Sequence, residues 1–92
     1  SDVYKRQKLW SLWCQVLTEN FTTAEKQILY IETELKLKKN DEILLNEIIT
    51  NYHLRKKNWN LAIKYLKAIN SKNVNKEKKS RNYFISSLLL EL

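Results

Sequence analysis

The most apolar stretch of the sequence lies between Trp59 and Asn70, and its apolar positions recur at the spacing of a helix. One row, at i, i+3, i+7 and i+10, consists of Trp59, Ala62, Leu66 and Ile69. A second apolar row consists of Leu61, Tyr65 and Ala68. A helix that is apolar around most of its circumference is buried on two sides. The pattern therefore predicts a central helix here, with one partner helix before it and one after it.

The same periodicity predicts four further helices, over residues 5–18, 22–38, 40–56 and 76–91. Thr22 and Glu25 have the spacing of a capping box at the start of the second helix. Asn40 is placed to cap the third. Connectors of roughly two to five residues favour antiparallel neighbours. A closed bundle and a stack of helix hairpins both satisfy this pattern.

An internal repeat favours the stack of hairpins. The pattern aromatic-x2-Ala-x3-aliphatic-x2-Ile occurs twice, each time at the start of the second helix of a pair. Its first copy is Phe21, Ala24, Ile28 and Ile31. The second copy begins 38 residues later (59 − 21 = 38) and is Trp59, Ala62, Leu66 and Ile69.

This repeat resembles the tetratricopeptide repeat (TPR), in which a helix ends in a short turn that is followed by an aromatic residue and then a small one. In that comparison Ile49 is the large apolar residue of the first helix, Trp59 the aromatic residue at the turn, and Ala62 the small contact residue. The resemblance covers residues 9–91 as about two and a half repeats. It implies an all-α fold of antiparallel helix hairpins, stacked as a right-handed solenoid fragment.

The composition excludes several classes of function. The chain has no Gly and no Pro, and β-hairpins, phosphate-binding loops and dinucleotide-binding turns all depend on glycine. With one Cys and one His, neither an intrachain disulfide nor a Cys/His metal site is expected. No Ser/His/Asp set stands out either. We therefore expect no enzymatic activity, no metal and no cofactor.

The net charge of +7 leaves a second functional hypothesis open. Most of the 17 cationic residues are lysine and only three are arginine. Nucleic-acid surfaces often use arginine for bidentate contacts, so this balance favours a compositional bias over a polyanion partner. A basic helical nucleic-acid-binding module is the first alternative, and a compact helical-bundle regulator is the second.

The TPR resemblance also implies a groove lined by the first helix of each pair. Glu47, Asn51 and Arg55 recur at i, i+4 and i+8 on the third helix. Asn51 would hold a peptide backbone or carboxylate, and Arg55 an anion. The same groove would include Lys78 and Asn82 of the last helix. The competing interpretation is an ordinary solvated stripe. We predict a cytoplasmic protein–protein interaction module, a TPR-like scaffold or adaptor that binds a peptide or protein segment.

Separate predictions concern the two ends of the chain. Residues 1–7, S-D-V-Y-K-R-Q, resemble translated sequencing-adaptor sequence, and the chain contains no Met. We expect residues 1–7 to be non-native, and residues 8–92 to form a single domain from a longer protein. Residues 84–92 hold more apolar side chains than one helix face accommodates. This excess predicts self-association through the last helix, or a continuation beyond it.

Overall fold

A computed structural model of the chain describes residues 1–72, and within that range the structure is entirely helical. The elements are α1 (Asp2–Leu17), α2 (Phe21–Glu34), α3 (Lys39–Arg55) and α4 (Trp59–Lys72). The all-α prediction is confirmed for this part of the chain, which contains no strand. The fifth helix, predicted over 76–91, lies outside the described residues. No helix formed by residues 1–72 is long and apolar enough to cross a membrane.

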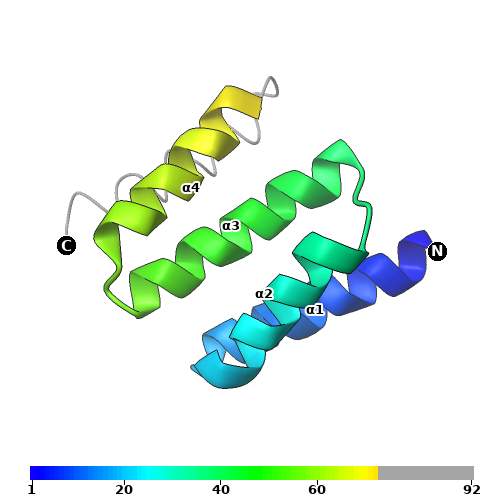
Figure 1. Cartoon of the computed structure of the whole chain (residues 1–92), viewed down its shortest axis with the longest axis horizontal. Coiled ribbons are helices and arrows are strands. Elements are labelled where there is room, and N and C mark those ends of the chain that lie inside the picture. Colours follow the sequence, from blue (N-terminus) through cyan, green and yellow to red (C-terminus); the bar gives the residue numbers. More distant parts are fainter. Residues whose placement is uncertain (73–92) are drawn as a thin grey trace.

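The four helices form two hairpins that meet along α3 (Figure 1). α1 packs against α2, α3 packs against α4, and α1 also packs against α3. Figure 1 shows α3 running between α4 on one side and the α1–α2 pair on the other. Among residues 1–72 the helix with partners on both sides is therefore α3. The central position predicted for residues 59–70 requires a partner helix after them; that helix lies outside the described residues, so the central position stays a prediction.

Buried polar residues accompany the position of α3 between its partners. Eight of the 17 residues of α3 are buried, and three of them are the polar residues Asp41, Glu47 and Thr50. The Thr50 hydroxyl donates to the backbone carbonyl of Asn46 at 2.7 Å, which satisfies it inside the protein. A hydrophobic pattern counts such positions as solvent-facing. On α4, by contrast, the apolar side chains of Trp59, Leu61 and Ile63 are exposed.

The main hydrophobic core lies between α1, α2 and α3. Leu9, Leu12 and Val16 form the buried row of α1 at i, i+3 and i+7. The remaining buried members of this core are Ala24, Ile31, Leu45, Ile48, Ile49 and Tyr52. A second buried set lies outside this cluster, on α3 and α4, and consists of Ile43, Thr50, Ala62, Leu66 and Ile69. α3 thus contributes residues to both sets.

The two hairpin turns have the same geometry, again 38 residues apart. Glu19 and Lys57 adopt the left-handed conformation, with φ of 59° and 62°, although a glycine usually occupies this position at the end of a helix. Each is followed by an asparagine and then by the aromatic residue of the repeat. Two backbone hydrogen bonds close each turn. Their N···O distances are 3.1 Å for Glu19–Val16, 2.9 Å for Asn20–Gln15, 3.0 Å for Lys57–Leu54 and 2.8 Å for Asn58–His53. These are the paired bonds of a Schellman motif.

Two of the four repeat positions next to these turns show matching burial. Ala24 and Ala62 are fully buried, as are Ile31 and Ile69. Leu66 is buried, whereas its counterpart Ile28 and the aromatic Phe21 are half-buried. Trp59 is exposed. The internal repeat therefore extends from sequence to turn geometry and to the two alanines, while membership of the TPR family stays a prediction.

The helix caps differ from those predicted. α2 begins at Phe21 with Asn20 at its N-cap, and no side-chain cap bond forms there. The capping box predicted for Thr22 and Glu25 is wrong, because the Glu25 carboxylate accepts hydrogen bonds from Tyr52 and Lys56 instead. α2 also ends earlier than predicted, at Glu34. α3 begins at Lys39, so Asn40 lies inside the helix and does not cap it.

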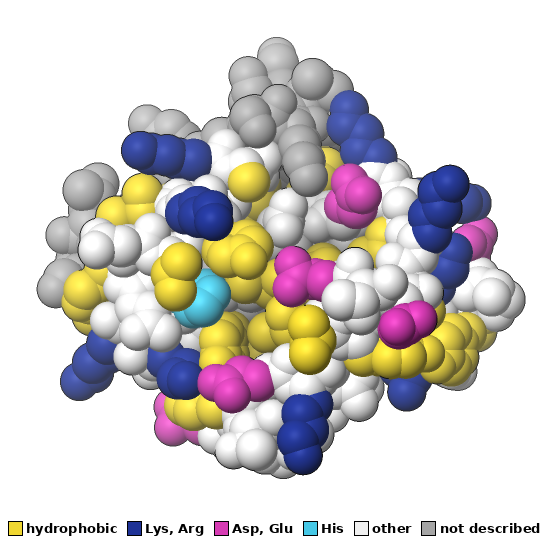
Figure 2. Space-filling view, in the orientation of Figure 1, with side chains coloured by type: hydrophobic (Ala, Val, Ile, Leu, Met, Phe, Trp, Pro, Cys, Tyr) yellow, Lys and Arg dark blue, Asp and Glu magenta, His cyan; other side chains and the backbone are white. Residues whose placement is uncertain are grey.

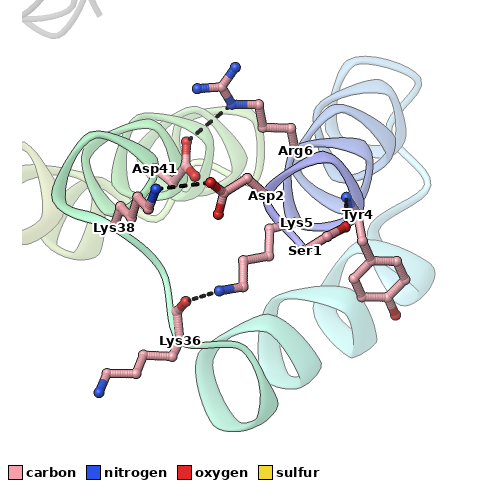
Figure 3. A network of polar contacts seen from close by, with 8 residues as sticks. All are labelled: Ser1, Asp2, Tyr4, Lys5, Arg6, Lys36, Lys38 and Asp41. Atoms are coloured by element: carbon pink, nitrogen blue, oxygen red, sulfur yellow. Dashed lines mark hydrogen bonds and ion pairs between the residues drawn. The ribbon is translucent and has the colours of Figure 1, made fainter.

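Polar contacts connect the first turns of α1 to the connector between α2 and α3 (Figure 3). The Lys38 ammonium lies 2.9 Å from the Asp2 carboxylate. Lys5 donates to the backbone carbonyl of Lys36 at 2.6 Å. The hydrogen bond and charge of Lys38 lower the pKa of the Asp2 carboxyl. The non-native origin of residues 1–7 is not tested by these contacts and stays a prediction.

Candidate binding surface

The three groove residues predicted on α3 differ in exposure. Glu47 is only 8% exposed, whereas Asn51 is half-buried and Arg55 is exposed. Arg55 Nε donates to Asn51 Oδ1 at 3.2 Å, and its guanidinium lies 3.8 Å from the Glu19 carboxylate. A uniformly solvated stripe is thus excluded by the burial of Glu47. Lys78 and Asn82 lie outside the described residues, so the groove itself stays a prediction.

A different surface of α3, the one between α2 and α4, faces the viewer in Figure 2. Helical spacing places Glu25, Leu29 and Glu32 along one flank of α2. The same rule places Leu61 and Tyr65 along one flank of α4. We define the front face by these two flanks and the α3 residues between them: Glu25, Leu29, Glu32, Asn46, His53, Leu61 and Tyr65.

Aromatic contacts join α3 to its neighbours at one end of the front face. The rings of His53 and Tyr65 stack with centroids 5.5 Å apart and an angle of 26°. Tyr52 meets His53 edge-on at 4.9 Å, and Phe21 of α2 meets Tyr52 edge-on at 5.7 Å. Such pairs contribute about 0.5–1.5 kcal/mol each beyond area burial. They fix the position of α4 relative to α2 and α3.

The charged groups at this end of the front face form hydrogen bonds and an ion pair with neighbouring side chains of the protein. The Tyr52 hydroxyl donates to Glu25 Oε1, and Lys56 Nζ lies 2.9 Å from the same oxygen. These two hydrogen bonds, with that from Tyr52 the stronger influence, lower the pKa of the Glu25 carboxyl. The Lys56 ammonium also lies over the rings of Tyr52 and Phe21, at 5.3 and 5.8 Å. The group therefore holds α2 against α3, and its charges are already paired within the protein.

At the other end of the front face lies a depression between α2 and α3, which we call the hollow. The hollow has a volume of about 210 Å³ and is lined by Ile31, Glu32, Leu35, Leu37, Glu42, Leu45 and Asn46. Four of these residues are aliphatic and two are carboxylates. None of the salt bridges among residues 1–72 involves Glu32. The hollow therefore combines aliphatic side chains with two acidic residues.

Exposed apolar side chains flank the front face. Leu29, one turn before Glu32 on α2, is 64% exposed. Leu61 is exposed on the opposite flank, where it also lines a depression of about 390 Å³ over residues 57–61. That depression takes all its walls from one turn of the chain, whereas the hollow takes them from two helices and their connector. The hollow and Leu29 therefore form the better-defined contact site.

The chain matches no protein-family model, and no curated protein or solved structure is significantly similar to it.

His53 makes the stability of the fold depend on pH. Its Nδ1 is shielded from solvent and has no hydrogen-bond partner among residues 1–72. Burial, and then the charge of Lys56, lower the pKa of His53 below its usual value of 6.5. The unfolded chain therefore binds the proton more readily than the folded one. The stabilisation from neutral His53 is fully present above about pH 6.5 and is lost as the pH falls through the lower pKa of the folded state.

We expect the urea midpoint of the wild-type protein to fall as the pH is lowered from about 7.5 to 5. His53→Phe retains an aromatic ring beside Tyr65 but does not titrate, so its midpoint should fall less over the same interval. Carboxylates such as Glu25 titrate in both proteins and cancel in the comparison. Parallel declines for the two proteins would show that His53 is not the responsible group.

Proposed function

We propose that the protein is a protein–protein interaction module, and that it binds a peptide or protein segment on its front face. The observation that carries this proposal is the hollow next to Leu29, an aliphatic side chain that is 64% exposed. Peptide-binding surfaces typically combine an apolar depression for an anchor side chain with a few polar groups that fix its orientation. Exposed apolar residues beside such a depression mark a contact site.

The contacts at the other end of the front face argue for binding and against catalysis. Hydrogen bonds connect the side chains of Glu25, Tyr52 and Lys56 to one another. His53 is held between aromatic rings. The front face thus combines side chains that are held by one another with a hollow, an arrangement that suits recognition.

The architecture we propose for the whole chain is a TPR-like stack of helix hairpins, acting as a scaffold or adaptor in the cytoplasm. It is supported by the repeated turn at Glu19 and Lys57 and by the buried alanines that follow each turn. The groove with Glu47, Asn51 and Arg55 lies on another side of α3 and remains a separate proposal within this architecture.

On the face shown in Figure 2, the positive charge does not favour a nucleic-acid surface. Lys and Arg side chains are scattered over the visible face and not gathered in one patch (Figure 2). Several of them pair with carboxylates of the chain itself, as Lys38 does with Asp2 and Lys56 with Glu25. A polyanion surface would instead align unpaired cations along a stripe.

Substitution of Leu29 tests the proposal. Peptides selected from a random display library against the wild-type chain would be measured by fluorescence anisotropy against Leu29→Glu. We expect at least about a tenfold loss of affinity, which corresponds to about 1.4 kcal/mol, because the new carboxylate would replace an apolar contact. Leu29 is so exposed that the fold should be retained, which circular dichroism would verify.

The matched control is Leu17→Glu, which makes the same change at an exposed leucine of α1, away from the front face. We expect it to leave peptide affinity unchanged. Equal losses for both variants would place binding elsewhere. Failure to select any peptide above a scrambled control would contradict the proposed function.

A further inference from the structure

We propose that the hollow takes the side chain of a lysine or arginine, so that the segment bound on the front face is basic. This inference rests on the proposed function and specifies the chemistry of the partner.

The floor of the hollow suits an aliphatic stem. Ile31 of α2 and Leu45 of α3 are buried. Leu35 and Leu37, from the end of α2 and its connector to α3, are half-buried around them. A volume of about 210 Å³ far exceeds the 10–15 Å³ that one water needs. Lysine and arginine characteristically lay their methylene stems along such apolar surfaces while the charged group remains at the rim.

The rim suits the cation at the end of that stem. Two acidic residues line the hollow from different helices, Glu32 from α2 and Glu42 from α3, and Asn46 of α3 lines it too. Glu32 is exposed and enters no salt bridge with a cation of residues 1–72. Its charge also acts on Tyr65 of α4, since burial and then the negative charge of Glu32 raise the pKa of that tyrosine. A bound cation would be stabilised by charge-assisted hydrogen bonds to this carboxylate.

Other occupants fit less well. An uncharged apolar side chain would fill the floor but would remove water from the exposed Glu32 carboxylate without replacing it, which is unfavourable. An acidic segment or a nucleic acid would bring like charge against Glu32 and Glu42. The chain as a whole has a net charge of +7. A basic segment therefore has to be recognised by Glu32 and Glu42 themselves, because the overall charge and the neighbouring Lys36, Lys38 and Lys39 are positive.

The test is a double-mutant cycle between peptide and protein. In each selected peptide that depends on Leu29, every lysine and arginine would be replaced in turn by norleucine, which keeps an aliphatic stem and removes the charge. We expect one position to lose affinity by about three- to fivefold, the range of a partly exposed ion pair. In the Glu32→Gln protein the same replacement should have almost no effect.

Glu34→Gln is the matched control, because Glu34 lies two residues further along α2 on the flank next to Tyr30. It should leave the norleucine effect at its wild-type size. Peptides that need Leu29 but show no cation coupled to Glu32 would overturn this inference and leave the proposed function standing. The same holds for selected peptides that are acidic. Peptides that bind independently of Leu29 would instead contradict the proposed function itself.

Discussion

Replacing Ile48 with alanine is expected to lower the free energy of unfolding by about 2–5 kcal/mol. Ile48 is 1% exposed and belongs to the core shared by α1, α2 and α3. Truncation would remove its apolar contacts and leave a cavity in the helix that connects the two hairpins. Urea unfolding followed by circular dichroism measures the change. Leu29→Ala, at an exposed position, should cost no more than about 0.5 kcal/mol. A loss below about 1 kcal/mol for Ile48→Ala would contradict the burial of Ile48 in the core that joins α3 to α1 and α2.

Enlarging Ala62 is expected to have the second largest effect. Ala62 is fully buried on α4, and Ala24 occupies the equivalent position on α2. Leucine at either position would overpack the contact between paired helices and should cost roughly 1–3 kcal/mol. Thermal unfolding of Ala62→Leu and Ala24→Leu would measure this. The exposed position Lys67 on α4 provides the control Lys67→Leu, which should leave the midpoint nearly unchanged. An unchanged midpoint for Ala62→Leu would mean that α4 has open space at this position.

The helices of residues 1–72 were predictable because their signals are local. Apolar residues at helical spacing identify α1 to α4 to within a few residues of their ends. The turn positions follow from the same sequence feature, the asparagine and aromatic residue that precede Ala24 and Ala62. Which helix of residues 1–72 is the most buried could not be predicted in this way. Asp41, Glu47 and Thr50 are buried by helices far away in the sequence, and only the packed structure shows how such polar groups are accommodated.

The candidate site was less predictable than the fold. Spacing correctly places Asn51 and Arg55 next to each other on α3, but it does not show that Glu19 from the preceding turn lies near Arg55. The hollow depends on the end of α2, the connector and α3 together, so no single helical pattern contains it. The available signal was Glu32, a carboxylate one residue after the buried Ile31 and one turn after Leu29.

Mapping a bound peptide onto the protein tests the central claim most directly. Backbone amide shifts of the ¹⁵N-labelled chain would be followed by NMR during titration with a selected peptide. We expect the largest changes along the front face, at Leu29, Glu32, Asn46, His53 and Tyr65, and we expect none of them in the Leu29→Glu variant. Changes confined to the exposed side of α1, or to Asn51 and Arg55, would contradict that claim.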